Sequence, residues 1–258
     1  MSKISKTFEN KKAFIAFITG GDPDIETTEK IILAIQEAGA DLIEIGIPFS
    51  DPMAEGVVIQ DADERALASG CTTDKLFDMV SRLRPKVQIP LLFMTYLNPI
   101  YTYGKERFLK GCQASGIDGI IVPDMPYEEK EELAPLCETF NIDLISMIAP
   151  TSEERIAMIA KEAKGFLYCV SSLGVTGVRS EINTDLNKMI SQVKKVSSIP
   201  CAIGFGVSSP KQAHDLGQIA DGVIVGSAIV KLIAEHGRES ALPVKQYVSE
   251  MKNQLIGL

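Results

Sequence analysis

Eight short apolar runs constrain the fold of this chain more than any other feature of its sequence. They are rich in β-branched residues, and most of them end at Gly, Pro, Asp or Ser. Apolar runs that alternate with helices are typical of strands in a parallel sheet that is buried on both faces. The predicted strands are residues 13–19, 41–45, 89–95, 117–122, 142–148, 166–170, 199–203 and 222–225.

Segments with helical spacing separate most of these strands. Ile31, Ala34, Ile35 and Ala38, for example, form one helix face that ends at Gly39. Eight such units in 258 residues favour an α/β fold of the closed (β/α)8 TIM barrel type over an open doubly wound sheet. The first loop also lacks the G-x-G-x-x-G pattern of a dinucleotide-binding fold. We therefore predict one barrel domain over residues 1–258, with additional terminal helices in residues 1–12 and 239–258.

The acidic balance and the scarcity of histidine narrow the possible functions. With 26 basic and 34 acidic residues the net charge is −8, which disfavours nucleic-acid binding. Five scattered cysteines without a C-x-x-C pair favour a reducing compartment and argue against a metal site. Because no apolar run approaches the roughly 20 residues that span a bilayer, we expect a cytoplasmic protein without a membrane partner. Only two histidines are present, so acid–base chemistry is expected to rest on carboxylates.

Glu44 is the first candidate, because it interrupts an otherwise apolar strand. Burying an ionised carboxylate is costly, so its pKa is expected to rise toward the range of a general acid–base. Reactive groups of such barrels lie at the carboxyl ends of the strands. The alternative is a structural Glu paired with backbone donors or with a Lys.

The loop after this strand carries two further carboxylates. Asp51 precedes Pro52, a pattern typical of a turn. Glu55 precedes Gly56, in a loop long enough to bring a second carboxylate over the barrel mouth. Taken alone, however, Glu55 is better explained as an ordinary exposed residue.

Glycines follow each of the last three predicted strands. Gly226-Ser227 leads directly into a helical run, while Gly174 and Gly204 open the two preceding loops. Backbone N–H groups of such loops, together with a helix N-terminus, form the usual phosphate site of these barrels. A single glycine usually marks only a turn, but three in succession favour a phosphate monoester as substrate.

Other residues at strand ends have two interpretations. Phe17, Met94, Tyr96, Tyr168 and Phe205 form either an apolar substrate pocket or simple core. Asp124 either binds a polar group of the substrate or caps the helix that follows it.

Taken together, these strings resemble the tryptophan synthase alpha subunit family. The matching strings are FITGGDP (17–23), EIGIPFSDP (44–52), PDMP (123–126), GVTG (174–177), GFGVS (204–208) and GSAIV (226–230). The resemblance covers nearly the full chain and implies a lyase of tryptophan biosynthesis that cleaves indole-3-glycerol phosphate to indole and glyceraldehyde 3-phosphate. It also implies a beta subunit partner in an alpha2beta2 tetramer. Pyridoxal phosphate is expected in that partner, and no cofactor in this chain.

The resemblance assigns roles to individual residues. Glu44 matches the glutamate that moves protons at indole C3 and at the glycerol hydroxyl, and Glu55 stands where a second carboxylate polarises the indole N–H. The positions that match substrate contacts are Phe17, Met94, Tyr96, Asp124, Tyr168 and Thr176. The positions that match the phosphate site are Gly177, Gly204, Phe205, Gly206, Gly226 and Ser227. Asp51, Pro52, Asn98 and Pro99 fall in loops that face the beta subunit.

One departure from the family pattern concerns the second carboxylate. The family string is D-P-x-A-D-G-P, whereas residues 51–57 read DPMAEGV, so Glu55 replaces an Asp and Val57 replaces a Pro. Our hypothesis is that Glu55 takes the family role with a looser or shifted loop closure. A competing hypothesis is a catalytically weakened subunit that mainly activates the beta subunit. A sugar-phosphate isomerase or epimerase would share the glycine loops but not residues 44–55, and a non-enzymatic partner subunit would keep only the interface loops.

Overall fold

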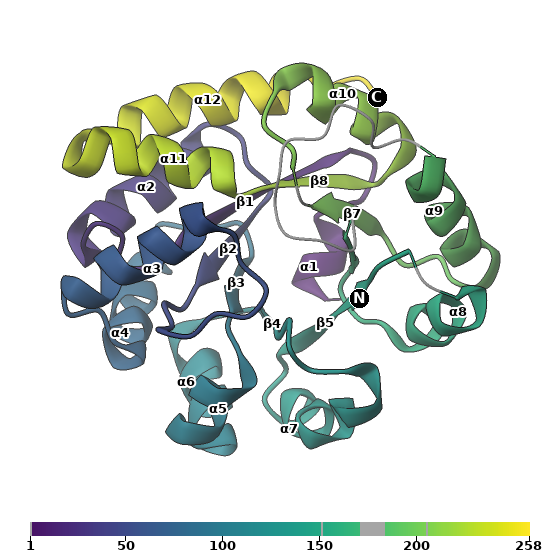
Figure 1. The fold of residues 1–258 in the computed structure, drawn as a ribbon, viewed down its shortest axis with the longest axis horizontal. Coiled ribbons are helices and arrows are strands. Elements are labelled where there is room, and N and C mark those ends of the chain that lie inside the picture. Colours follow the sequence, from purple (N-terminus) through teal and green to yellow (C-terminus); the bar gives the residue numbers. More distant parts are fainter. Residues whose placement is uncertain (1, 151, 171–183, 205) are drawn as a thin grey trace.

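Eight parallel strands close into a barrel in the computed structural model of this chain (Figure 1). The structure describes residues 2–150, 152–170, 184–204 and 206–258. Each strand pairs with the next, and β8 pairs with β1, so the predicted (β/α)8 barrel is confirmed. The strands are β1 Ala13–Thr19, β2 Leu42–Gly46, β3 Leu91–Met94, β4 Gly119–Ile121, β5 Asp143–Ile148, β6 Leu167–Val170, β7 Cys201–Gly204 and β8 Gly222–Val225.

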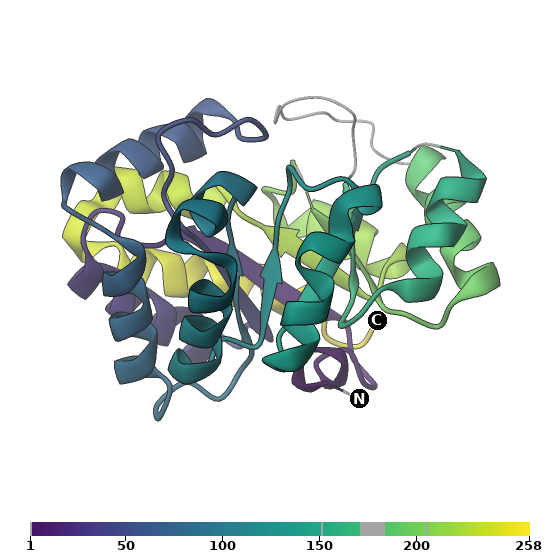
Figure 2. The ribbon, with the colours of Figure 1, turned by 90° about the horizontal axis from the view of Figure 1, so that it is seen from below.

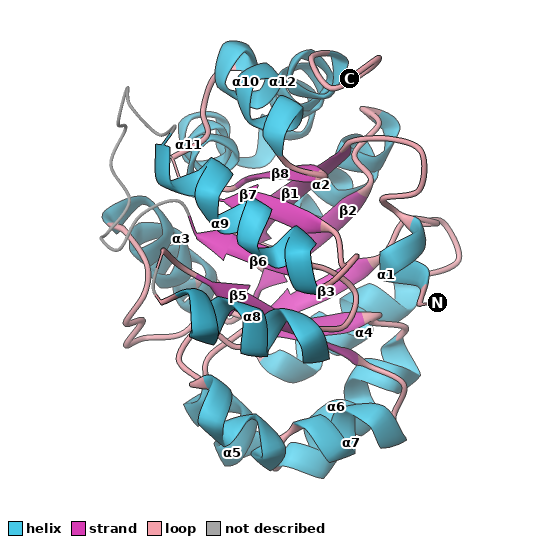
Figure 3. Ribbon diagram, turned by 90° about the vertical axis from the view of Figure 1, so that its right-hand side faces the viewer, coloured by secondary structure: helices cyan, strands magenta, loops and turns pink. Residues whose placement is uncertain are grey.

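Helices surround this barrel, as Figure 3 shows from the side. The helices are α1 Lys3–Lys6, α2 Ile25–Glu37, α3 Val57–Ala68, α4 Thr73–Leu83, α5 Leu97–Tyr103, α6 Lys105–Ser115, α7 Ala134–Thr139, α8 Glu153–Glu162, α9 Thr184–Val196, α10 Pro210–Ile219, α11 Ser227–His236 and α12 Ala241–Asn253, with 3-10 turns η1 Tyr127–Glu132 and η2 Gly237–Glu239. None of the described helices is long and apolar enough to cross a membrane.

Side chains alternate between the two faces of each strand, because successive residues of a strand point in opposite directions. Outward residues such as Ile43, Phe93 and Ile203 pack with the helices in one large apolar cluster. Inward residues such as Leu42 and Leu92 fill the barrel axis in a second cluster. The period of two therefore decides that Glu44, which shares its face with Leu42, points into the barrel.

The two terminal segments differ in what they cover. Ile4 of the short helix α1 and Phe8 belong to the axial cluster, and the Phe8 and Phe166 ring centroids lie 5.5 Å apart. The N-terminal segment therefore closes the end of the barrel where the strands begin (Figure 2). At the other terminus, α12 packs on the outside against α2, and its Lys252 Nζ lies 2.6 Å from Asp41 Oδ2. Both predicted terminal helices are present, although the first covers only Lys3–Lys6.

Neither of the described terminal helices, α1 and α12, packs on the carboxyl ends of the strands. There α3 and α11 lie side by side beside β1 (Figure 1). Phe17 of β1, Ile59 and Ala62 of α3 and Val230 of α11 form a separate small apolar cluster. This cluster fixes where the two helices begin relative to the barrel mouth.

Candidate active site

A cavity of about 420 Å³ opens at the carboxyl ends of the strands, between β1, α3 and α11. It brings together seven of the residues singled out from the sequence, which are Phe17, Glu55, Met94, Tyr168, Gly206, Gly226 and Ser227. These residues come from separate strands and loops, and the closed barrel is what makes them neighbours. The cavity is therefore the candidate active site.

Glu44 lies next to this cavity on the inner face of β2. It is opposite Phe17 of β1 and Leu92 of β3 in the strand register. Its side chain is fully buried, and neither carboxylate oxygen has a hydrogen-bond partner among the described residues. Burial raises the pKa of Glu44 to about 8, so the carboxyl is neutral at neutral pH. The expected pKa rise is confirmed, and the alternative of a Glu paired with backbone donors or a Lys is wrong within the described part of the chain.

Tyr168 of β6 lies on the opposite side of the barrel interior. It is buried, and the pKa of its hydroxyl is raised first by burial and then by the charge of Glu44. A Cβ atom on Gly204 would overlap the Tyr168 hydroxyl and ring. Glycine at position 204 is therefore required for the close approach of Tyr168, a function that the sequence pattern of a phosphate loop did not indicate.

Glu55 is held over the cavity by side chains from two other elements. Asp63 of α3 and the Tyr96 hydroxyl at the end of β3 lie beside its carboxylate, and its Oε2 atom is buried without a hydrogen-bond partner among the described residues. Tyr96 Oη in turn accepts a hydrogen bond of 3.0 Å from the backbone N–H of Ala54. Burial raises the pKa of Glu55. The interpretation of Glu55 as an ordinary exposed residue is therefore wrong.

The remaining cavity wall has the character of an anion site. Ser227 is the first residue of α11, so the free N–H groups of that helix end point toward the cavity. Gly206 has a φ of +77°, a conformation that favours glycine. Ser208 and Lys231 line the same wall and were missed from the sequence. Lys231 follows Ser227 by one helical turn, which is the signal that would have identified it. Thr176, Gly177 and Phe205 lie outside the described residues.

Two residues that were predicted to contact the substrate, Tyr96 and Asp124, instead contact other groups of the protein. Tyr96 is 3 % exposed and does not line the cavity itself, but its hydroxyl lies beside Glu55, which does. The Asp124 carboxylate accepts the backbone N–H of Leu97, at 3.0 and 3.2 Å to its two oxygens. Leu97 begins α5, so the interpretation that Asp124 caps the helix following it is wrong. It caps the helix of the preceding βα unit, because adjacent parallel strands bring their carboxyl ends together.

The four residues predicted to face a partner lie on the same rim as the cavity. Asp51 and Asn98 are exposed, and Pro52 and Pro99 are half-buried. Met53 of the loop after β2 and Val57, the first residue of α3, are 83 % and 69 % exposed, which is unusual for apolar side chains. The rim therefore presents apolar surface directly beside the loop that carries Glu55.

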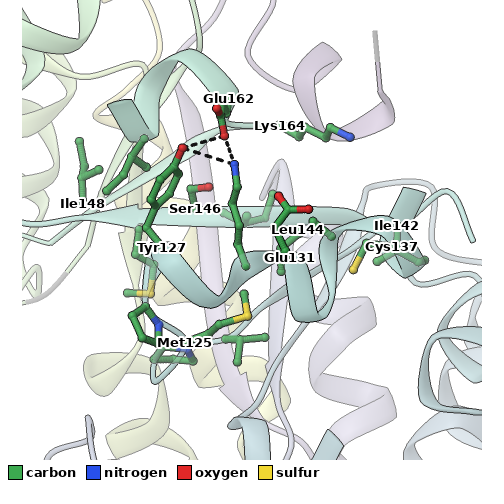
Figure 4. Close-up of a pocket in the computed structure, with 18 of the residues that line it drawn as sticks. Met125, Tyr127, Glu131, Cys137, Ile142, Leu144, Ser146, Ile148, Glu162 and Lys164 are labelled. Carbon is green, nitrogen blue, oxygen red and sulfur yellow. Dashed lines mark hydrogen bonds and ion pairs between the residues drawn. The ribbon is translucent and has the colours of Figure 1, made fainter. Parts of the chain in front are cut away.

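A second cavity of about 440 Å³ lies on the outside of the barrel, between β5, η1, α7 and α8 (Figure 4). Two of its lysines are paired with carboxylates of the same cavity, Lys130 with Glu162 and Lys164 with Glu138. Tyr127 Oη donates a hydrogen bond of 2.7 Å to Glu162, and Lys130 pairs with the same carboxylate. Among its described lining residues none is a predicted site residue. The described ranges also hold no group of three or more His, Cys, Asp or Glu arranged to bind a metal.

Comparisons with known proteins agree with this geometry. The sequence model of the family described as tryptophan synthase alpha chain matches residues 4–255. The tryptophan synthase alpha chain of Lactiplantibacillus plantarum is 48% identical over 258 residues, which cover 100% of this chain and 97% of that protein. The crystal structure of tryptophan synthase subunit alpha from Legionella pneumophila superposes with a TM-score of 0.89 at 34% identity, over 100% of both chains. A chain of the tryptophan synthase complex from Pyrococcus furiosus superposes with a TM-score of 0.86 at 37% identity, over 94% of this chain and 99% of that chain.

Proposed function

Because the chain belongs to the tryptophan synthase alpha chain family, we propose that Glu44 and Glu55 act together at the barrel mouth in the reaction of that family. The chain is a lyase of tryptophan biosynthesis that cleaves indole-3-glycerol phosphate to indole and glyceraldehyde 3-phosphate. The roles of the individual residues follow from their burial and their hydrogen bonds. The observation that carries them is a neutral, unpaired carboxyl inside the barrel, next to a cavity with a second carboxylate at its mouth.

The phosphate of the substrate is proposed to bind at Gly206, Gly226 and the N-terminus of α11 at Ser227. Backbone N–H groups and the helix dipole favour an anion there, and Lys231 adds a positive charge. The indole ring then lies toward Phe17, Met94 and Glu55. This orientation places the bond between indole C3 and the glycerol chain above Glu44 and Tyr168.

The bond between C3 and the glycerol chain breaks only after the indole ring has been protonated. Glu44, which is neutral at neutral pH, delivers its proton to indole C3. The positive charge that develops on the indole nitrogen is stabilised by Glu55, whose carboxylate accepts the N–H. Glu44, now a carboxylate, removes the proton of the hydroxyl on the carbon attached to C3. The electron pair of the breaking bond restores the indole ring, the hydroxyl carbon becomes the aldehyde, and Glu44 regains its proton.

The rim loops are proposed to bind a beta subunit. Solved complexes of tryptophan synthase superpose on the chain, which supports a beta partner. The exposed Met53, next to Pro52, and the exposed Val57 at the start of α3 support the same face. We further propose an alpha2beta2 tetramer in which the beta subunit holds pyridoxal phosphate, with residues 1–258 acting as one cytoplasmic domain. Light scattering of the mixed subunits would report the stoichiometry.

The weakened-subunit hypothesis has no support in the geometry or in the comparisons. Glu55 is not displaced from the site, since it lines the cavity and lies beside Asp63 and Tyr96. The test is indole release from indole-3-glycerol phosphate, measured with and without beta subunit. We expect turnover by the wild type in both cases and a loss of about 10²-fold or more in the rate of Glu55→Gln. Glu64→Gln, at an exposed position in the neighbouring helix α3, serves as the control. Equal rates for wild type and Glu55→Gln would overturn the role of Glu55.

A further inference from the structure

Asp63 is a buried carboxyl in α3 that the proposed mechanism does not use. It is 4 % exposed and lies on the same helix face as Ile59, Ala62 and Ala66. It lies beside the Glu55 carboxylate and the backbone N–H of Phe49, and Glu55 Oε2 is buried without a hydrogen-bond partner among the described residues. It therefore joins α3 to both ends of the loop that follows β2.

The charges around Asp63 come from four elements. Glu55 contacts it from the loop after β2, the Tyr96 hydroxyl lies close by at the end of β3, and the Cys71 thiol lies beyond α3. Asp22 approaches from the loop after β1, but its charge is bound by Arg65 through two hydrogen bonds of 2.8 and 2.9 Å. Among the described residues no cation pairs with Asp63 or Glu55.

Asp63 is buried and so is the Oε2 atom of the half-buried Glu55. Without a cation, two such neighbouring carboxyls cannot both be ionised, so they share one proton. The donors around them show where it sits. Tyr96 Oη accepts the Ala54 N–H, which leaves the Tyr96 proton for Glu55. Two hydroxyls therefore lie beside Glu55, whose buried Oε2 atom has no other partner among the described residues, whereas Asp63 lies beside only the N–H of Phe49. The charge is better stabilised on Glu55.

We propose that Asp63 is a positioning residue whose protonated carboxyl donates a hydrogen bond to the Glu55 carboxylate and holds it over the indole site. The proposal rests on the proposed role of Glu55. It also gives a reason for Glu in place of the usual Asp, because the additional methylene extends the carboxylate toward α3. The pKa of Asp63 agrees with a protonated carboxyl, because burial and the charge of Glu55 raise it to about 9.

The proposal has a consequence at alkaline pH. When Asp63 loses its proton it can no longer donate to Glu55, and the two like charges repel each other. Activity therefore falls with two ionisations, that of Glu44 near pH 8 and that of Asp63 near pH 9. Asn at position 63 keeps a donor for Glu55 and an acceptor for Phe49 but does not ionise.

The first experiment compares the pH profiles of kcat/KM for wild type, Asp63→Asn, Asp63→Ala and the exposed control Asp61→Asn. We expect the limiting alkaline slope to be −2 in wild type and Asp61→Asn but −1 in Asp63→Asn. At pH 10 the activity of Asp63→Asn, relative to its own neutral value, is then about ten-fold above that of wild type. Asp63→Ala is expected to lower kcat about 10- to 100-fold at pH 7 with a smaller change in KM. An alkaline slope in Asp63→Asn equal to that of wild type would overturn the proposal.

A second readout does not depend on turnover. In protein labelled with carboxyl-¹³C aspartate, one resonance is expected to titrate near pH 9, to be absent in Asp63→Asn and to persist in Asp61→Asn. If no aspartate resonance titrates above pH 7, Asp63 is ionised and the proposal is wrong. The Glu55→Gln variant distinguishes a failure of the Asp63 proposal from a failure of the proposed catalytic role of Glu55. Loss of activity in Glu55→Gln together with an unchanged Asp63→Asn profile rejects only the role of Asp63.

Discussion

Arg65 of α3 binds Asp22 of the loop after β1 through two parallel hydrogen bonds, Nε to Oδ1 at 2.8 Å and Nη2 to Oδ2 at 2.9 Å. The Asp22 side chain is fully buried, whereas that of Arg65 is 35% exposed. This pair anchors α3 to the barrel two residues after Asp63. The position of the Glu55 network thus depends on an ion pair that does not touch the cavity.

Removal of Arg65 leaves the buried Asp22 without its counter-charge. We expect Arg65→Ala to lower the free energy of unfolding by about 2–3 kcal/mol, which is below the value for a fully buried pair because Arg65 is partly solvated. Arg82→Ala, which breaks the exposed pair with Glu29, is expected to cost less than about 1 kcal/mol. Urea unfolding at pH 7 measures both, and equal losses in the two variants would show that the Asp22 pair does not anchor α3.

Glu44 makes the stability of the protein depend on pH. Its pKa is about 8 in the folded protein, against 4.5 for the unperturbed group. Between these values the folded state holds a proton that the unfolded state has lost, so stability falls as pH rises toward 8. Glu44→Gln does not titrate. The stability of this variant relative to wild type is expected to rise by a few kcal/mol between pH 5 and pH 8, as measured by urea unfolding. A pH-independent difference would mean that Glu44 is ionised inside the barrel.

The length of Glu55 matches its two partners. In Glu55→Asp the carboxylate moves back by one methylene from Asp63 and Tyr96, and a displacement of about 1 Å can cost roughly 100-fold in rate. We expect kcat to fall by at least about ten-fold in this variant, with a smaller change in KM. A many-fold increase in steady-state cleavage would instead show that the natural Glu impairs catalysis, as the weakened-subunit hypothesis requires.

Ser227 lies where the substrate phosphate is proposed to bind. Ser227→Asp places a negative charge at the N-terminus of α11, where it repels the phosphate, and is expected to raise KM about ten-fold or more with a smaller effect on kcat. Ser152→Asp, at the N-cap of α8 and away from the cavity, is the matched control. Inhibition by inorganic phosphate is expected to weaken in parallel in Ser227→Asp only, and an unchanged KM would place the phosphate elsewhere.

The strands and Glu44 were predictable because their signals are local. Apolar runs of strand length locate the strands to within a few residues, and a single carboxyl in such a run is costly wherever the barrel places it. The site around Glu55 was only partly predictable. Its partners Asp63 and Tyr96 come from different elements, and their contact depends on how α3 packs against the rim. Asp124 illustrates the same limit, since the N–H that it binds belongs to a helix earlier in the chain.

The central claim is that the buried, neutral Glu44 is the acid that starts cleavage. The most direct test is the steady-state rate of indole release from indole-3-glycerol phosphate at pH 7 by wild type and Glu44→Gln, both supplied with beta subunit. Circular dichroism shows whether the variant is folded, and Glu64→Gln serves as the exposed control. The account predicts a loss of about 10²- to 10⁴-fold in Glu44→Gln and a wild-type rate in Glu64→Gln. A folded Glu44→Gln protein that cleaves the substrate at the wild-type rate would contradict it.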